Sequence, residues 1–180
     1  MTASDFIVRE ARLGDAVAIA RIYVESWRDT YAGILPMRAL SAMDVEQHAA
    51  RWRSSIAMPG REAVLVAESG KDTIIGMTSL GRARDAGLGL DGEIYTLYVH
   101  PLATSNGVGR ALLRTGFEEL ADRGYRSAVI WAHAQNPARF FYQAMGGKLI
   151  AERVTFVMGA SVPEAAFGWK SLALVETSRN

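Results

Sequence analysis

GEIYTLYVHPLATSNGVGRALL, residues 92–113, is the stretch that decides the fold. It begins with a run, 93–99, in which aromatic and β-branched residues favour a strand. Two glycines, Gly107 and Gly109, then precede a segment whose apolar residues recur at helical spacing. The first amides of a helix have no partner within the helix, and together with the helix dipole they attract phosphate oxygens. The stretch therefore predicts a strand, a phosphate-binding loop and a helix.

Spacing excludes two common phosphate loops. A dinucleotide fingerprint needs a third glycine three places after Gly109, where this chain has Leu112. A P-loop needs Gly-Lys followed by Ser or Thr, but the pairs at 70–71 and 147–148 are followed by Asp72 and Leu149. Two close glycines also fit an ordinary turn that caps a helix. The rest of the chain has to decide between a phosphate loop and a simple turn.

The remaining segments predict a mixed α/β protein. We expect strands at 6–9, 63–67, 73–80, 93–99, 127–131, 149–157 and about 165–174, and helices at about 13–31, 36–58, 107–123 and 136–145. The run 69–72 reads as a hairpin turn, so the strands around it should be antiparallel. The helix that ends near Arg123 links two strands by a crossover, which requires them to be parallel. The expected fold is a mixed, mostly antiparallel central sheet with helices on both faces, in one domain over 1–180.

Composition limits the class of protein. The chain has 180 residues, 20 Lys and Arg against 19 Asp and Glu, and no cysteine. A net charge of +1 does not suggest a nucleic-acid partner, and the lack of cysteine excludes a thiolate nucleophile and cysteine-bound metal. His48, His100 and His133 lack metal-ligand spacing, so we expect no metal and assign these residues structural or surface roles. No apolar run has the length of a signal peptide or a membrane span, which predicts a cytoplasmic protein without membrane contact.

Several motifs in order resemble the GNAT family of acyl-CoA-dependent N-acetyltransferases. They are the run 93–99 with Pro101, the loop and helix start 107–112, Asn136-Pro137-Ala138, Phe141-Tyr142 and Gly146-Gly147. The similarity covers most of the chain and implies that acetyl-CoA is the acyl donor. In that family the loop begins with Gln or Arg and its amides hold the pyrophosphate of coenzyme A. Thr104 stands at that first position and departs from the usual long side chain, while the backbone donors remain.

The resemblance also implies which residues contact the cofactor. Main-chain groups of the central strand pair with the amides of pantetheine and polarise the thioester carbonyl, and the loop and the next helix complete the site. The expected contacts are Leu97, Tyr98, Val99, Thr104, Ser105, Asn106, Gly107, Val108, Gly109, Arg110, Asn136 and Tyr142. Two of these have simpler alternatives: Asn136 before Pro137 fits a helix N-cap, and Arg110 fits a solvated helix residue.

Two residues are the catalytic candidates. Glu93 matches the position of a general base in several family members, because an acceptor ammonium must lose a proton before its nitrogen attacks. Tyr142 matches a phenol that protonates the departing thiolate. The alternatives are a solvated carboxylate at the strand end and a packed core tyrosine. Regular alternation would put Glu93, Tyr95, Leu97 and Val99 on one face of the strand, unless a bulge intervenes.

The acceptor pocket is expected near the end of the first helix. Asp29 and Glu25 would attract an ammonium, while Tyr31 and Trp27 would cover its apolar part, although aromatic residues at this spacing are more often core. We therefore expect direct acetyl transfer from acetyl-CoA to a primary amine of a small molecule or peptide, with a homodimer left open. The alternatives are a catalytically silent acyl-CoA-binding module and a protein N-acetyltransferase. The resemblance names a chemistry and leaves the acceptor open.

Overall fold

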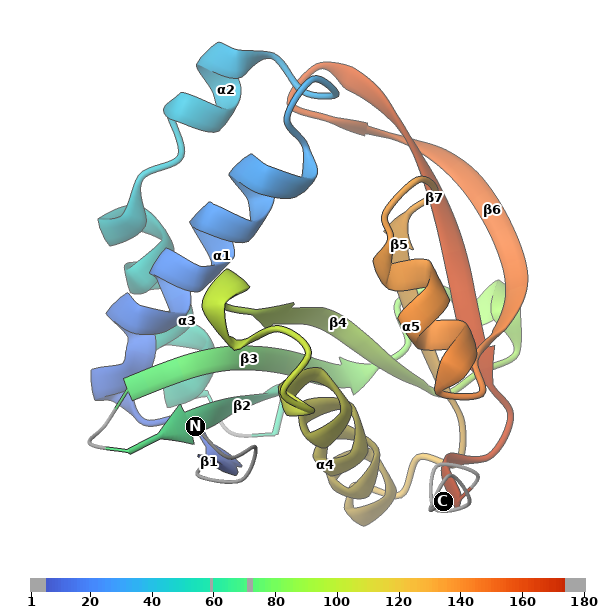
Figure 1. Ribbon diagram of the computed structural model, residues 1–180. Helices are drawn as coiled ribbons and strands as arrows, with labels where there is room; N and C mark the ends of the chain where they lie inside the picture. The colour runs from blue at the N-terminus through green and yellow to red at the C-terminus, as the bar shows by residue number, and fades with distance from the viewer. Residues whose placement is uncertain (1–5, 59, 71–72, 174–180) are drawn as a thin grey trace.

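The computed structural model describes residues 6–58, 60–70 and 73–173, and these form one seven-stranded sheet with helices on both faces (Figure 1). The strand order is β1-β2-β3-β4-β5-β7-β6. The strands are β1 (Phe6–Glu10), β2 (Glu62–Ser69), β3 (Thr73–Arg82), β4 (Gly92–Val99), β5 (Ala128–His133), β6 (Lys148–Val157) and β7 (Ala160–Trp169). The α-helices are α1 (Ala16–Thr30), α2 (Met37–Ser41), α3 (Val45–Ala57), α4 (Val108–Asp122) and α5 (Ala138–Ala144).

The pairing within the sheet confirms the predicted mixed topology. β4 and β5 are parallel, as the crossover through α4 requires, and all other described neighbours are antiparallel. The parallel contact is short, because it joins only residues 92–94 to residues 128–130. Beyond Ile94 the two strands diverge, and the sheet opens between its N-terminal half, β1–β4, and its C-terminal half, β5–β7 (Figure 1).

Two hydrophobic layers hold the helices against the sheet. On one face α4 and α5 bury Leu113, Phe117 and Tyr142 against strand residues such as Ile94 and Phe167. On the other face α1 and α3 pack over β2 and β3, in a cluster of Ala16, Ile19, Ala20, Ile22, Ala49, Trp52, Val64, Val66, Ile74 and Met77. Most of the apolar residues expected to face the core are buried, but Ala50 is exposed and its neighbour Ala49 takes the core position on α3.

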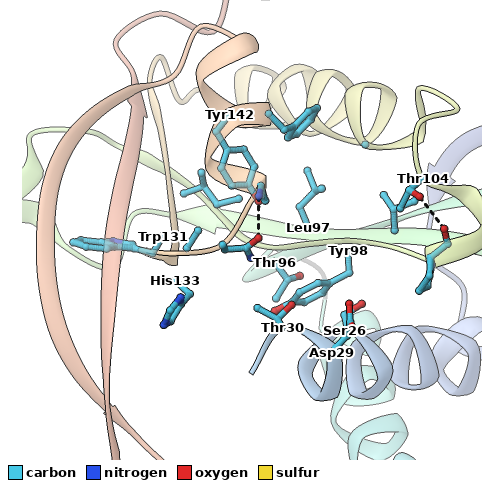
Figure 2. Close-up of a pocket in the computed structure, with 18 of the residues that line it drawn as sticks. Ser26, Asp29, Thr30, Thr96, Leu97, Tyr98, Thr104, Trp131, His133 and Tyr142 are labelled. Atoms are coloured by element: carbon cyan, nitrogen blue, oxygen red, sulfur yellow. Dashed lines mark hydrogen bonds between the residues drawn. The ribbon is translucent and has the colours of Figure 1, made fainter. Parts of the chain in front are cut away.

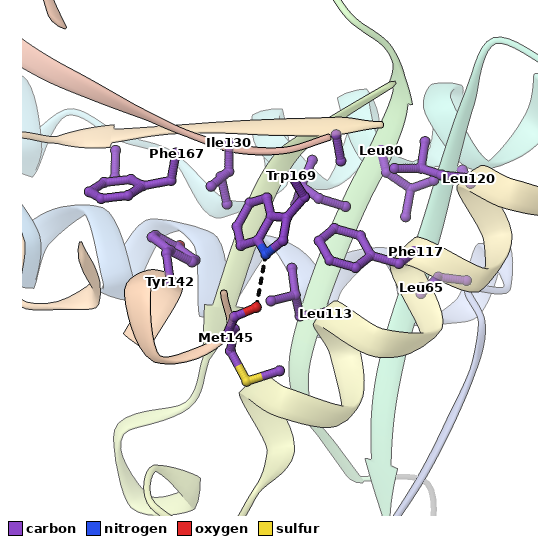
Figure 3. Close-up of a cluster of buried hydrophobic side chains, with 14 of the residues drawn as sticks. Leu65, Leu80, Leu113, Phe117, Leu120, Ile130, Tyr142, Met145, Phe167 and Trp169 are labelled. Carbon is purple, nitrogen blue, oxygen red and sulfur yellow. Dashed lines mark hydrogen bonds between the residues drawn. The ribbon is translucent and has the colours of Figure 1, made fainter. Parts of the chain in front are cut away.

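Trp169 organises the layer under α5 (Figure 3). The side chain is 1% exposed, its ring lies 5.1 Å from Phe117, and its indole N–H donates to the Met145 carbonyl at 2.8 Å. Gly146 has φ +84° and ends α5, as the double glycine predicted. A Cβ on the next residue, Gly147, would stand 2.6 Å from the Trp169 ring, so only glycine fits there.

Two sequence expectations about elements were wrong. The single helix expected over 36–58 is two helices, because Asp44 accepts a hydrogen bond from the Gln47 amide at 2.7 Å and caps a new helix, α3. The last strand begins at Ala160, not near 165, and ends at Trp169. Val162 and Glu164 therefore belong to β7, where β6 pairs with them; position 174, where the strand was expected to end, lies outside the described residues.

Candidate active site

The divergence of β4 and β5 leaves the main chain of β4 open on one side. The His100 amide donates to the Ile75 carbonyl at 2.8 Å, which fixes the alternation of the antiparallel β3–β4 ladder. In that alternation Tyr98 bonds to β3, whereas the amides and carbonyls of Leu97 and Val99 face the opening. A ligand that lies between the two halves of the sheet finds an unpaired strand edge there.

A β-bulge in β4 changes the direction of its side chains. Thr96 pairs with Ser79 and Ile94 with Leu80, so Tyr95 is an extra residue on β4. Ile94 and Leu97 consequently pack into the same cluster beneath α4. The regular alternation that would put Glu93 on the face of Leu97 and Val99 does not hold, because the bulge reverses the phase of the strand at Tyr95.

The predicted phosphate loop lies between β4 and α4. Ser105 and Gly107 have positive φ angles, +66° and +78°, and Gly107 is the N-cap of α4. The Ala111 amide donates to the Gly107 carbonyl at 3.0 Å, but the amides of Val108, Gly109 and Arg110 bind no acceptor among the described residues. The loop therefore presents three free main-chain donors at the N-terminus of α4, a fifteen-residue helix.

A cavity of about 890 Å³ joins this loop to the open edge of β4 (Figure 2). It contains ten of the twelve residues expected to contact a cofactor: Leu97, Tyr98, Val99, Thr104, Ser105, Gly107, Gly109, Arg110, Asn136 and Tyr142. The other two do not line it. Asn106 is exposed, and Val108 is only 1% exposed because it packs under the helix.

Some polar side chains around this first cavity already form hydrogen bonds within the protein. The Thr104 hydroxyl donates to the Pro101 carbonyl at 2.8 Å, and the Asn136 carbonyl oxygen accepts from the Ala138 amide at 2.9 Å (Figure 2). Asn136 thus binds the first amide of α5, although the N-cap residue is Pro137 and not Asn136 as its alternative interpretation predicted, and Asn136 also lines the cavity. Arg110 is exposed and has no ion-pair partner among the described residues.

Tyr142 is a core residue that also faces the cavity. Its side chain is 4% exposed and packs on Phe141 and Phe167, at ring distances of 5.4 and 5.8 Å. The hydroxyl makes no hydrogen bond within the described part of the chain, and Figure 2 shows it pointing toward β4. Burial raises the pKa of this phenol, so it keeps its proton through the neutral and mildly basic range.

Glu93 is held away from both cavities. It is 1% exposed, and Arg84 occupies both of its carboxylate oxygens. The Arg84 amide donates to Oε2 at 2.8 Å, and the guanidinium donates to Oε1 at 3.0 and 2.5 Å. A carboxylate in this arrangement is a structural ion pair at the start of β4, and proton transfer would require it to leave Arg84.

A second cavity, also of about 890 Å³, lies between α1, α3 and the β6–β7 hairpin. Five residues line both cavities and mark where they meet: Tyr31, Tyr95, Thr96, Tyr98 and Trp131. Aromatic rings follow one another along this wall, with centroids 5.5 Å apart for Tyr23 and Trp27, and 4.7 Å apart for Trp27 and Tyr31. The two cavities therefore meet at this junction.

The predicted acceptor residues are divided between these cavities. Asp29 lines the first cavity, Trp27 lines the second, and Tyr31 lines both. Glu25 lines neither; it is exposed and lies 3.9 Å from His100 Nε2. Burial raises the pKa of Tyr31, and the nearby Glu164 carboxylate raises it further. At neutral pH the Tyr31 phenol is thus uncharged.

Sequence reasoning missed the residues that the C-terminal half brings to the junction. Trp131 and His133 lie on the same face of β5, two positions apart. Glu164 of β7 is the cross-strand neighbour of His133. Arg153 of β6 pairs with Glu164 at 2.8 Å and stacks over Trp131, 3.7 Å from its ring centroid. Period-two alternation in β5 could have grouped Trp131 with His133, but the contribution of β6 and β7 depends on long-range pairing.

The residues that the structure describes lack two further features. No group of three or more His, Cys, Asp or Glu side chains in this part of the chain could hold a metal ion. None of its helices is both long enough and apolar enough to cross a membrane.

Comparison with known proteins identifies a family and a relative that spans most of the chain. The model of the acetyltransferase (GNAT) family matches residues 16–146. A Bacillus subtilis (strain 168) protein named as an uncharacterized N-acetyltransferase, YuaI, is 35% identical over 173 residues, which are 96% of this chain and 98% of the relative.

Solved structures share the fold. One neighbour is yncA from Salmonella typhimurium with acetyl-CoA as its cofactor, with a TM-score of 0.71 and 24% identity over 94% of this chain and 95% of the other. Another is the PaiA N-acetyltransferase from Thermoplasma acidophilum in complex with coenzyme A, with a TM-score of 0.67 and 21% identity over 90% and 98% of the two chains. At these identities the likeness establishes the mixed sheet and its helices.

Proposed function

Because the chain belongs to the acetyltransferase (GNAT) family, we propose that it transfers an acetyl group from acetyl-CoA to a primary amine of a small molecule or peptide. One observation carries the proposal: the unpaired edge of β4 and the free amides at the start of α4 open into a single cavity, which meets a second cavity at Tyr31, Thr96 and Tyr98. A donor site and an acceptor site that share a wall are what a direct transfer needs.

The first cavity is the proposed acetyl-CoA site. The amides of Val108, Gly109 and Arg110 bind the pyrophosphate, and the Arg110 side chain adds a cation at the same end. The amides of pantetheine pair with the exposed main chain of Leu97 and Val99 as a further strand would. The neighbours solved with coenzyme A or acetyl-CoA support a ligand of this kind in the fold.

The proposed reaction is direct attack of the amine on the thioester. A free amide of β4 stabilises the oxyanion that forms as the nitrogen bonds to the carbonyl carbon. When the carbon–sulfur bond breaks, Tyr142 donates its proton to the leaving sulfur; its raised pKa ensures that the proton is present. No enzyme nucleophile takes part. Glu93, the base predicted from sequence, would first have to give up its contacts with Arg84.

The experiment that tests this function is release of free coenzyme thiol from acetyl-CoA with a panel of polyamines, amino acids, aminoglycosides and peptide amines. We expect thiol release that depends on one class of amine, together with an acetylated product in the mass spectrum. Acetyl-CoA binding by calorimetry without thiol release for any amine would instead identify a silent binding module. A mass change only on protein substrates would identify a protein acetyltransferase.

A further inference from the structure

The second cavity contains a carboxylate that is open to a ligand, Glu164 on β7. Its side chain is 16% exposed, and it lines the cavity wall formed by the C-terminal half of the sheet. Its Oε2 accepts a hydrogen bond from Arg153 at 2.8 Å. No described residue donates to Oε1, which makes Glu164 the opposite of Glu93, whose two oxygens are both bound by Arg84.

The groups around Glu164 come from four other segments of the chain. Arg153 of β6 pairs with it, His133 of β5 is its cross-strand neighbour, Tyr31 follows α1, and Arg84 follows β3. The Arg153 guanidinium is itself stacked on Trp131, so it holds the Glu164 carboxylate in place beside the ring. His133 accepts a hydrogen bond from the Gln135 amide on Nδ1, which leaves Nε2 as the nitrogen that can donate.

Aromatic rings complete an environment suited to an ammonium group. Trp131 and Tyr31 line both cavities, and Arg153 already covers one face of Trp131, so an amine beside the Tyr31 ring lies at the junction with the donor site. A ring face and a carboxylate both attract a protonated amine, and partial burial strengthens that attraction. A carboxylate with one free oxygen can then accept a proton from it.

We propose that Glu164, oriented by Arg153, binds the ammonium of the acceptor and removes the proton that blocks its nucleophilic attack. The inference rests on the proposed acetyltransferase function and assigns the base to a residue that the sequence did not suggest.

The proton balance is complete. An alkylammonium gives one proton to Glu164 and becomes a neutral amine, whose lone pair bonds to the thioester carbon. The carbon–sulfur bond breaks, Tyr142 protonates the sulfur, and the second amine proton restores the Tyr142 phenol. Glu164 then releases its proton to solvent. The products are the N-acetylated amine and coenzyme A thiol.

The test compares Glu164→Gln with the wild type on two acceptors. One is the fastest ammonium-type amine of the panel, and the other is hydroxylamine, which is largely uncharged at neutral pH and needs no base. For the charged amine, kcat/KM should fall on the order of 10² to 10⁴-fold and recover partly at higher pH, while hydroxylamine should react at a rate close to that of the wild type. Glu164→Asp should restore part of the activity.

Two controls separate chemistry from folding. Gln has the shape of Glu and its amide oxygen can still accept from Arg153, so the melting temperature should change little. Glu152→Gln alters an exposed carboxylate on the neighbouring strand β6 and should leave both rates unchanged.

Two results would overturn the assignment to Glu164: wild-type rates with the charged amine, or equal losses with both acceptors in the Glu164→Gln variant. A wild-type protein that binds acetyl-CoA but acetylates neither the amine panel nor hydroxylamine would overturn the proposed function, and the inference with it. The wild type is active in the first case and inactive in the second. A failure of the Glu164 assignment can therefore be told from a failure of the proposed acetyltransferase function.

Discussion

At the scale of single residues, the candidate catalytic side chains differ in how many of their oxygen atoms are already bound by neighbouring residues. Glu93 and Glu164 are both carboxylates on strands of the sheet, but Arg84 binds both oxygens of Glu93, whereas Arg153 binds only one oxygen of Glu164. Tyr142 is packed on three sides by aromatic rings and still has an unpaired hydroxyl facing the cavity. The residue type suggests a role. Whether the residue can perform it depends on whether its neighbours leave an oxygen free to bind a ligand or transfer a proton.

Replacing Tyr142 by Phe tests the proton donor. The ring and its packing stay, and only the hydroxyl is lost, so turnover should fall roughly 10² to 10⁴-fold while the melting temperature and the affinity for acetyl-CoA stay near those of the wild type. Tyr125→Phe is the matched control, because Tyr125 packs on the same core but lines neither cavity. An unchanged rate for Tyr142→Phe would show that the thiolate leaves without this phenol.

Gly147→Ala tests the close packing under α5. The added methyl group would stand 2.6 Å from the Trp169 ring and 2.9 Å from the Tyr142 carbonyl, so the core must shift. We expect a loss of about 1–3 kcal/mol in the free energy of unfolding, measured with urea. Gly14→Ala has no heavy atom within 4 Å of the new methyl and should be close to neutral. Equal stability of the two variants would contradict the packing argument.

At the scale of elements, the short parallel contact between β4 and β5 is held by side chains at its end. Asp91, just before β4, accepts hydrogen bonds from the Arg126 amide, the Ser127 amide at 2.9 Å and the Ser127 hydroxyl at 2.6 Å. Burial by itself would raise the pKa of this carboxyl, but the bonds from Ser127 and Arg126 outweigh it and lower the pKa. Asp91 thus ties the two halves of the sheet together at the start of the parallel contact, the end opposite to the one where the strands diverge.

Asp91→Asn should therefore destabilise the protein in a pH-dependent way. A lowered pKa in the folded state means that the charged form stabilises the fold above the unfolded-state pKa, and that this contribution is lost as the pH falls through the folded-state pKa. At neutral pH the free energy of unfolding of the wild type should exceed that of the variant by only about 1 kcal/mol, because the site is largely exposed to solvent. This difference in the free energy of unfolding should become smaller in acid. Urea melts of both proteins, with Asp122→Asn as an exposed control, would measure it; a difference that does not depend on pH would rule out the charge as its source.

At the scale of the whole molecule, the two halves of the sheet form a cleft that a long ligand can span. α1 and α3 cover one face of the N-terminal half, the β6–β7 hairpin extends opposite them, and α4 and α5 close the other face (Figure 1). The loop before α4 and the residues at the end of β5 line one cavity although they belong to different halves. Binding in this cleft should link the halves and stabilise both.

Acetyl-CoA should accordingly raise the melting temperature. A ligand that binds only the folded state at 100 times its dissociation constant adds about 2.7 kcal/mol of stability. In Gly109→Pro this shift should be much smaller, because the substitution deletes one of the free donors; the helix itself tolerates proline in its first turn, so the unliganded protein should still fold. A full shift in the folded variant would contradict the loop assignment.

The local sequence determined the elements that short-range forces specify. Strand-forming runs, the glycine loop at 107–109, the parallel crossover and the Gly146 helix stop were all predicted from residues close together in the chain. The split of the helix expected at 36–58 was missed, although the Asp44 cap that causes it is itself a local signal.

Only the tertiary structure decided how distant segments share the site. The bulge at Tyr95 arises from the register between β3 and β4, and it alone sets which side chains of β4 point into which layer. The pairing of Glu93 with Arg84 and of Glu164 with Arg153 joins residues 9 and 11 positions apart across a loop and a hairpin. Sequence spacing carries no information on such contacts, because strand register and sheet opening depend on the packing of the whole molecule.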